Sequence, residues 1–278
     1  MKTDDRPIGL FDSGIGGLTV LRSLLTALPN ESFVYLGDTA RLPYGSKSSA
    51  TIERYLLQNI SFLNKLNVKA IVVACNSAST VLVDGHLSGS FQVPVYNVIE
   101  PGAKAALAAS VSKRIGVLGT KATVSANSYA TCILREKVSN TAVFQQACPL
   151  LVPLVEEGWV DDPLTNLVIH RYLSPLLSEK IDTLILGCTH YPALRGGIGR
   201  VAGSGVTLID SAEAIASAII ADIASSILGA NSGGNPLGSS LRPTLRLMTT
   251  DVSSSFTEIS ERLMHPHTIP ALEAVDIA

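Results

Sequence analysis

Two stretches with the same design decide the fold: residues 68–80 read V-K-A-I-V-V-A-C-N-S-A-S-T, and residues 181–194 read I-D-T-L-I-L-G-C-T-H-Y-P-A-L. Each is an apolar run that ends in a cysteine, Cys75 or Cys188, followed at once by small hydrogen-bonding residues. A buried parallel strand reads as a near-continuous apolar run, and the residues just past its carboxyl end line the ligand crevice of an open α/β sheet. Both cysteines are therefore placed for chemistry, with one thiol on each side of a substrate.

A structural interpretation of these cysteines competes with the chemical one. Free cysteine is among the most buried residue types, and a single cysteine after an apolar strand often packs as a small hydrophobe. The duplicated context favours function for Cys75 and Cys188. Cys132 and Cys148 lack that context, so we interpret both as structural.

Short apolar runs alternate with helical patterns along the first part of the chain. Residues 7–11, 32–36 and 70–74 have the character of strands, and residues 17–28 and 50–66 that of helices. This β-α-β-α-β order predicts a parallel, doubly wound sheet.

The pattern then starts again. Residues 113–124, K-R-I-G-V-L-G-T-K-A-T-V, mirror residues 6–17, R-P-I-G-L-F-D-S-G-I-G-G, and a cysteine strand follows each at similar distance: 67 residues separate Ile8 from Cys75, and 73 separate Ile115 from Cys188. We therefore expect an α/β fold of two pseudo-symmetric, doubly wound parallel-sheet domains that face each other across a cleft.

The domain boundaries follow from the punctuation of the chain. Pro94, Pro101 and Gly102 mark the join between the two copies. The C-terminal part, a helix, a Gly/Ser-rich connector at 231–240, a strand-like run and a last helix, is too small to bury its own core. We expect it to pack back on the first copy. The first domain is then residues 1–98 plus 208–278, and the second is residues 99–207.

Composition excludes several classes of partner. The chain has 278 residues, a formal net charge of −2, 46% hydrophobic residues and no long basic block, so we expect neither nucleic acid nor an anionic membrane as partner. The N-terminus does not resemble a secretory signal, and Glu213 and Asp222 interrupt the most apolar helix candidate. We expect a cytoplasmic protein with free thiols and no metal site. The oligomeric state stays open, with a homodimer as one option.

The glycine-rich turn D-S-G-I-G-G at 12–17 does not match a dinucleotide fingerprint. Gly14 and Gly16 are followed by Thr19 where the third glycine belongs, which disfavours NAD. The turn still places backbone N–H groups and Ser13 at a helix N-terminus, a ready site for a carboxylate. A tight turn in which Asp12 only caps the helix is the alternative.

Pyridoxal chemistry is disfavoured as well, because neither cysteine stretch contains a lysine for a Schiff base. Lys47 is the nearest to a motif and has no phosphate-binding loop beside it. We expect no cofactor.

Neutral polar residues and two titratable neighbours surround the expected site. Donors and acceptors that suit a small zwitterionic acid come from Tyr44-Gly45, Asn76-Ser77 and Thr189. The alternative is that these residues only form a turn or satisfy backbone groups at the end of a strand. His190 follows Cys188 by two residues and can favour its thiolate, while Asp12 is the analogous helper for Cys75.

Five motifs together carry a family resemblance. D-S-G-I-G-G, G-D-T-x-x-x-P-Y-G, A-C-N-S-A-S, V-P-L-V-E-E-G and L-G-C-T-H-Y-P occur in the order and at the spacing typical of glutamate racemases, within the aspartate/glutamate racemase superfamily. The resemblance covers nearly the whole chain, from Pro7 to about Met264. It implies a cofactor-independent 1,1-proton transfer between L- and D-glutamate, with the D-enantiomer used for peptidoglycan.

The resemblance also implies residue roles. Cys75 would take the Cα proton from D-glutamate and Cys188 from L-glutamate, with the opposite thiol returning a proton. The assisting acid–base residues would be Asp12, His190 and Glu156, with Glu157 as a rival for the last. The substrate-binding residues would be Asp12, Ser13, Tyr44, Gly45, Asn76, Ser77, Thr120, Thr189 and His190. Ser77 stands where the family usually has threonine, which keeps the hydroxyl and removes a methyl group.

Other functions stay open at this stage. Another small acidic amino acid such as aspartate could be the substrate. A hydrolase or decarboxylase of the same superfamily would need one thiol with His190, and a non-catalytic binding protein would need neither. Some family members respond to a cell-wall precursor through an N-terminal extension; only six residues precede Pro7 here, so we expect no such activation.

Overall fold

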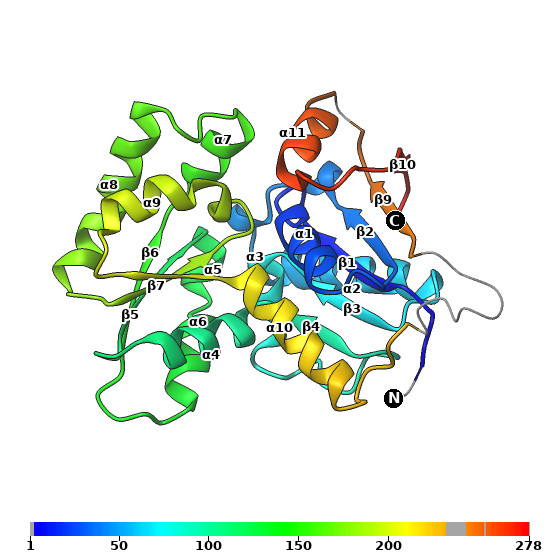
Figure 1. Ribbon diagram of the computed structural model, residues 1–278, viewed down its shortest axis with the longest axis horizontal. Coiled ribbons are helices and arrows are strands. Elements are labelled where there is room, and N and C mark those ends of the chain that lie inside the picture. The colour runs from blue at the N-terminus through cyan, green and yellow to red at the C-terminus, as the bar shows by residue number, and fades with distance from the viewer. Residues whose placement is uncertain (1–2, 232–242, 253, 278) are drawn as a thin grey trace.

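The computed structural model describes residues 3–231, 243–252 and 254–277 and contains two parallel β-sheets surrounded by helices (Figure 1). Neighbouring strands in both sheets pair in parallel. The predicted α/β class with two doubly wound parallel sheets is confirmed. The predicted connector at 231–240 lies, apart from Asn231, outside the described residues.

The first sheet has six strands in the order β10-β9-β2-β1-β3-β4. Its central strands are fully buried apolar runs, which is why they read as parallel strands in the sequence. The bounds are β1 Ile8–Asp12, β2 Phe33–Gly37, β3 Ala70–Val73, β4 Val95–Asn97, β9 Leu245–Thr249 and β10 Leu272–Ala274. Sequence analysis did not foresee β10, which has three residues at the sheet edge.

Helices cover both faces of this sheet (Figure 1). They are α1 Leu18–Ala27, α2 Ser49–Lys65, α3 Asn76–Ser79, α10 Ser211–Ala224 and α11 Ser254–Met264, with short 3-10 turns η1 Thr39–Arg41, η2 Tyr44–Ser46 and η3 Thr80–Leu82. The longest, α2, begins where the Ser48 hydroxyl accepts a hydrogen bond from the Thr51 N–H at 3.4 Å.

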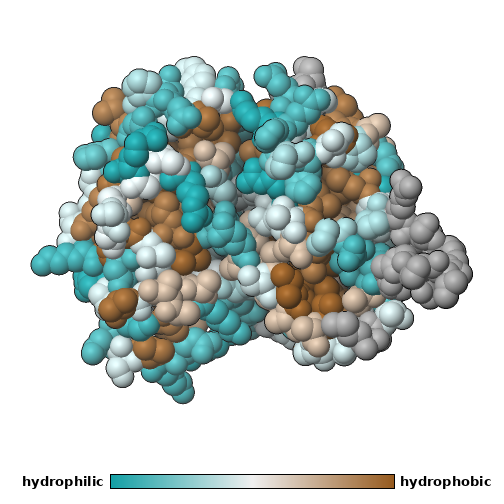
Figure 2. Space-filling view, viewed as in Figure 1, coloured by the Kyte–Doolittle hydropathy of each residue, from teal (hydrophilic) through white to brown (hydrophobic). Residues whose placement is uncertain are grey.

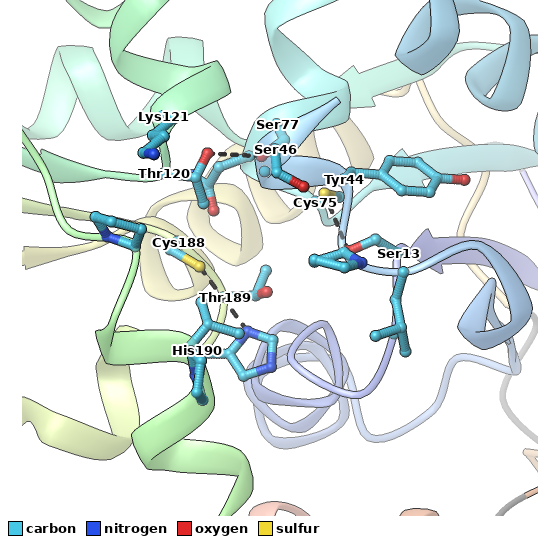
Figure 3. A pocket seen from close by; sticks show the side chains of 18 of the residues that line it. Ser13, Tyr44, Ser46, Cys75, Ser77, Thr120, Lys121, Cys188, Thr189 and His190 are labelled. Atoms are coloured by element: carbon cyan, nitrogen blue, oxygen red, sulfur yellow. Dashed lines mark hydrogen bonds between the residues drawn. The ribbon is translucent and has the colours of Figure 1, made fainter. Parts of the chain in front are cut away.

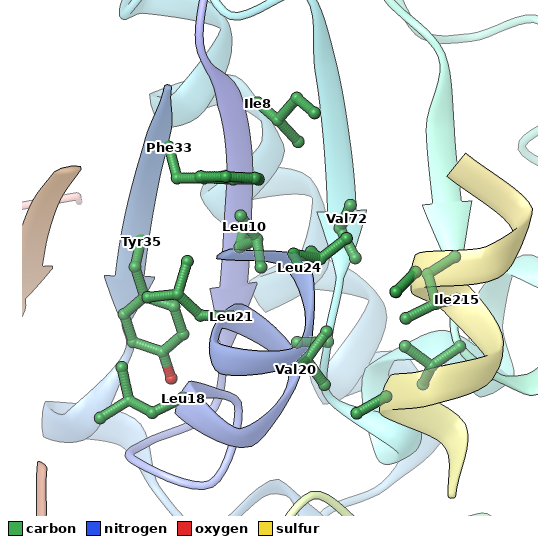
Figure 4. Packing of buried hydrophobic residues seen from close by; sticks show 14 of the residues in the cluster. Ile8, Leu10, Leu18, Val20, Leu21, Leu24, Phe33, Tyr35, Val72 and Ile215 are labelled. Carbon is green, nitrogen blue, oxygen red and sulfur yellow. The ribbon is translucent and has the colours of Figure 1, made fainter. Parts of the chain in front are cut away.

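One core of the first half lies between this sheet and helices α1 and α10 (Figure 4). Large side chains from neighbouring strands interlock there with one face of α1. Burying each of them stabilises the fold by roughly 1.5–3 kcal/mol. The strand residues include Ile8, Leu10, Phe33, Tyr35 and Val72, and the helix residues include Leu18, Leu21, Leu24 and Ile215.

The second sheet has four strands in the order β6-β5-β7-β8. Their bounds are β5 Arg114–Gly119, β6 Ala142–Ala147, β7 Thr183–Gly187 and β8 Thr207–Asp210. The helices of this half are α4 Ile99–Ala109, α5 Lys121–Ser125, α6 Ser128–Arg135, α7 Leu151–Glu156, α8 Pro163–Ser178 and α9 Arg195–Ala202, with the 3-10 turn η4 Tyr191–Leu194. Asp162 caps α8 by accepting from the Leu164 N–H at 2.7 Å, and Pro163 occupies the first helical position.

The two sheets share a local strand order. β2-β1-β3-β4 in the first corresponds to β6-β5-β7-β8 in the second, so β1 and β5 are equivalent, as are β3 and β7. The chain therefore repeats one topology, and in each copy the strand order reverses at the first strand. Ligands of open α/β sheets bind at the carboxyl ends of the strands beside such a reversal. Asp12 ends β1, while Cys75 and Cys188 follow β3 and β7.

The second domain boundary can be compared with the strand pairing on either side of it. β8 pairs with β7 and extends the four-stranded sheet to Asp210, whereas β9 of the C-terminal part pairs with β2 of the first sheet. The division into domains at 98/99 and 207/208 stays a prediction. No helix in the described part of the chain combines the length and apolar character that a membrane span requires.

Candidate active site

The carboxyl ends of equivalent strands deliver the two cysteines to one cavity. Cys75 follows β3 and begins the short helix α3, and Cys188 directly follows β7. Both line a cavity of about 250 Å³ between the two halves and lie on opposite sides of it (Figure 3). In the surface view a groove separates the halves and is bordered largely by hydrophilic residues (Figure 2).

The cavity wall contains most of the residues that the sequence singled out. They are Ser13, Tyr44, Gly45, Cys75, Asn76, Ser77, Thr120, Glu156, Cys188, Thr189 and His190. Among the described residues, no group of three or more His, Cys, Asp or Glu side chains is arranged to hold a metal ion.

Cys75 is almost completely buried. Its Sγ is 3.7 Å from the Ser13 hydroxyl, to which it donates. Burial raises the pKa of Cys75 well above the ordinary range of a thiol, and the nearby Asp12 charge raises it further. Cys75 therefore holds its proton in the unliganded protein.

Asp12 lies behind the cavity wall rather than in it. It is fully buried and accepts hydrogen bonds from the Gly14 N–H at 3.1 Å and, across the interface of the two halves, from the Thr189 hydroxyl at 3.4 Å. Burial raises the pKa of Asp12, and the charge of His190 works against that increase. From this position Asp12 can exchange a proton with Cys75 but does not line the cavity.

Cys188 belongs to a chain of three groups. Its Sγ lies 3.8 Å from His190 Nδ1, and His190 Nε2 lies 3.1 Å from Glu156 Oε1. Burial alone would lower the pKa of His190, but its hydrogen bonds to Cys188 and Glu156 outweigh burial and raise the pKa to about 10. At neutral pH the imidazole is thus a cation beside the sulfur. Glu156, and not Glu157, makes this contact.

The glycine-rich turn at 12–17 lets the two halves of the molecule pack closely against each other. A Cβ on Gly16 would lie 2.3 Å from Thr189 Oγ1 and 2.5 Å from His190 Nδ1, distances that no side chain can occupy. The helix α1 begins at Leu18 with Gly17 at its N-cap, so Asp12 makes no side-chain cap there. The absence of a side chain at Gly16 therefore leaves room for Thr189 and His190, which directly follow Cys188.

Two hydroxyls bridge the halves on the other side of the cavity. The Ser77 and Thr120 hydroxyls are 2.9 Å apart, and Thr120 also contacts Thr123 at 3.0 Å. Ser77 thus keeps a hydrogen-bonding role with one methyl group fewer than threonine.

Tyr44 borders the cavity without presenting its hydroxyl. That hydroxyl points away from the cavity, donates to Asp38 and accepts from Asn59 Nδ2 at 3.1 Å (Figure 3). Arg41 closes the network by an ion pair of 2.7 Å with Asp38. This buried polar cluster holds the loop at Tyr44 and Gly45 against the cavity.

Sequence reasoning missed several residues of the wall. They are Gly14, Leu42, Pro43, Ser46, Lys121, Pro149, Val152 and Pro153. Most of them lie inside or beside the motifs already quoted, so motif membership was the available signal. Asp38 and Tyr129 also support the site from behind, and only Asp38 lies in a motif. Cys132 and Cys148 are buried and do not line the cavity, and burial raises the pKa of Cys132 to about 11.

The chain is similar to several known proteins. Residues 12–219 match the family model described as Asp/Glu/Hydantoin racemase. A glutamate racemase of Syntrophus aciditrophicus is 45% identical over 98% of this chain and 97% of its own.

Two solved structures are similar over nearly their whole length. A glutamate racemase isoform of Bacillus anthracis superimposes with a TM-score of 0.88 at 37% identity, covering 98% of this chain and 97% of that one. A glutamate racemase of Francisella tularensis, solved in complex with D-glutamate, has a TM-score of 0.87 at 36% identity and covers 98% of both chains.

Proposed function

The chain belongs to the Asp/Glu/Hydantoin racemase family, and we propose that it interconverts L- and D-glutamate by moving the Cα proton between two thiols. The observation that carries the proposal is the placement of Cys75 and Cys188, from equivalent strands of two repeated halves, on opposite sides of one cavity. Inverting a carbon needs a proton acceptor on one face and a proton donor on the other. The enzyme is an isomerase of an amino acid.

The reaction from L-glutamate begins with the Cys188 thiolate. It takes the Cα proton, so that the C–H electron pair stays on the substrate as a carbanion, and the Cys75 thiol gives its proton to the opposite face. The product is D-glutamate, with Cys75 as thiolate and Cys188 as thiol. The reaction from D-glutamate runs through the same steps with the thiols exchanged.

Asp12 and His190 return the thiols to their starting states. His190 is 3.8 Å from Cys188 and can supply a counter-ion to its thiolate or pass it a proton. Asp12 interacts with Cys75, and burial has raised its pKa, which suits a carboxyl group that exchanges protons. Glu156 holds the imidazole in place from its far nitrogen.

The charged groups of the substrate match hydrogen-bonding groups of the cavity wall. Hydroxyls of Ser13, Ser77 and Thr120 and the amide of Asn76 can hydrogen-bond the charged groups of the substrate. We infer that the D-glutamate formed supplies peptidoglycan synthesis.

Location and assembly belong to the same proposal. Four free cysteines suit a reducing compartment such as the cytoplasm. Three apolar side chains are substantially exposed: Trp159 at 47%, Leu164 at 48% and Leu167 at 69%. Exposed apolar side chains of this kind support a homodimer, in which a second copy would cover them. Light scattering of the purified protein measures the assembly directly.

The deciding experiment is racemisation in D2O. The purified enzyme is incubated with each enantiomer of glutamate and of aspartate. The products are separated by chiral chromatography, and their deuterium content is measured by mass spectrometry. We expect both glutamate enantiomers to form and to carry deuterium at Cα. A product of changed composition would indicate a one-thiol hydrolase or decarboxylase, and deuterated aspartate would change the substrate assignment.

A further inference from the structure

Asn76 is held between the two halves of the molecule. It lines the cavity, and its Nδ2 donates to the Tyr129 hydroxyl at 2.8 Å. Tyr129 comes from α6 of the second half and is fully buried, and its ring lies against the strand of Cys188: a Cβ on Gly187 would be 3.1 Å from Tyr129 Cε2. Within the described structure, Asn76 Oδ1 is buried and has no hydrogen-bond partner.

A count of protons along this chain of contacts sets the orientation of the Asn76 amide. The Leu186 carbonyl can only accept, so Ser211, with Oγ at 3.3 Å, donates to it. Ser211 then has no proton left for Tyr129, which must donate to Ser211 across 2.9 Å. Burial raises the pKa of Tyr129, so the hydroxyl keeps its single proton. Toward Asn76 it can only accept, and the amide must present its Nδ2.

We propose that Tyr129, directed by Ser211, is a positioning residue that keeps the Asn76 carbonyl oxygen free for the ammonium group of the substrate. This inference rests on the proposed function and adds to it the group that reads the amino end of glutamate. The two carboxylates of glutamate can only accept hydrogen bonds, and its ammonium group can only donate. A buried acceptor without a partner therefore selects the ammonium group. A reversed amide would direct two N–H donors at that cation.

Two substitutions remove the orientation in different ways. Tyr129→Phe removes the acceptor that holds Nδ2. Ser211→Ala leaves Tyr129 in place but removes the acceptor for its proton, so the hydroxyl can turn to donate to Asn76 Oδ1 and reverse the amide. Tyr96→Phe is the matched control, because its hydroxyl donates at 2.7 Å to Asp222 on the same helix α10 and Tyr96 does not line the cavity.

The expected signature is a change in substrate affinity that depends on the ammonium group. For both variants we expect KM for L- and D-glutamate to rise about tenfold with kcat within about twofold, because the ammonium group is the same in ground and transition state. Inhibition by glutarate, which has both carboxylates and no ammonium group, should keep its wild-type constant. Tyr96→Phe should change neither quantity.

The outcomes separate the possibilities. An unchanged KM in Ser211→Ala, or glutarate inhibition that weakens in parallel with KM, overturns the inference and leaves Tyr129 a packing residue. If Tyr129→Phe does not fold, as judged by thermal unfolding, Ser211→Ala carries the test. A wild-type enzyme that does not racemise glutamate contradicts the proposed function instead, and calorimetric titration with D-glutamate and glutarate then still tests the orientation of Asn76.

Discussion

The two thiols have different surroundings although they follow equivalent strands. Cys75 is buried beside the carboxyl group of Asp12, and the raised pKa of the Cys75 thiol keeps that thiol protonated. Cys188 has the imidazolium of His190 as neighbour. The unliganded enzyme therefore holds a proton donor on the Cys75 side and a cation on the Cys188 side. In the proposed reaction from L-glutamate, Cys75 gives its proton and the His190 cation can stabilise a Cys188 thiolate.

In the proposed mechanism each thiol is needed in every turnover, so Cys75→Ala and Cys188→Ala should each abolish racemisation. Losing one acid–base group costs about 10²–10⁴-fold in rate. The measurement is kcat in both directions by circular dichroism. Cys132→Ala is the control, because Cys132 is buried outside the cavity, and it should retain near wild-type activity. Full activity in either active-site variant would refute the two-thiol mechanism.

The pH dependence should report the Glu156–His190 contact. Burial lowers the pKa of His190, but hydrogen bonds to Cys188 and Glu156 raise it to about 10. Glu156→Gln should therefore move the alkaline limb of the pH–rate profile to lower pH, by about one unit. Glu157→Gln should leave the profile unchanged.

Stability should follow the same linkage. A histidine whose folded pKa exceeds its unfolded value of about 6.5 stabilises the fold fully below that pH and loses the contribution as pH rises through about 10. The loss of thermal stability in Glu156→Gln should therefore be larger at pH 6 than at pH 10. An equal loss at both pH values would contradict the assignment of the cation to His190.

At the scale of elements, the turn η2 of the first half meets the start of α5 in the second. A Cβ on Gly45 would lie 2.8 Å from Thr120 Cβ, so a side chain there must push the two halves apart. Gly45→Ala should reduce kcat/KM by about tenfold or more, because a displacement of about 1 Å in a reacting geometry can cost about 10²-fold. Gly205→Ala is the matched control, since no atom of the described residues lies within 4 Å of the added Cβ. Normal kinetics in Gly45→Ala would show that the halves adjust at no cost.

At the scale of the whole molecule, a buried ion pair joins segments distant in the chain. Lys69 Nζ lies 2.6 Å from Glu31 Oε2 and also donates to the backbone carbonyls of Asp4 and Gly229, each at 2.8 Å. Both charged groups are almost completely buried. The pair therefore ties the segment before β1 and the segment after α10 to the starts of β2 and β3.

Removing the lysine should be costly, because it leaves the Glu31 charge buried without a partner. Lys69→Met should lower the free energy of unfolding by about 3–5 kcal/mol. Arg246→Met, which breaks the exposed pair of 2.7 Å with Glu273, should cost no more than about 1 kcal/mol. Chemical denaturation measures both. Equal costs would mean that burial of the Lys69 pair adds nothing.

The amino-acid sequence by itself determined the local features of this protein. Its apolar runs specify buried strands, and the residues that follow them, Cys75 and Cys188, must then lie at strand ends. The repeat of one strand and helix order specified two copies of one topology. These features depend on hydrogen bonding and side-chain polarity within short segments, which is why they can be read from the sequence without a structure.

Only the tertiary structure decided which groups meet across the two halves. Glu156 contacts His190 while the adjacent Glu157 does not, Asp12 lies behind the cavity wall, and Tyr44 turns its hydroxyl to Asp38. Tyr129 reaches Asn76 from 53 residues away and belongs to no motif. Such contacts arise when separate elements pack, and a side chain's orientation then depends on neighbours that are remote in the chain. The sequence pattern specifies the strand ends, and packing specifies the partners that their side chains find there.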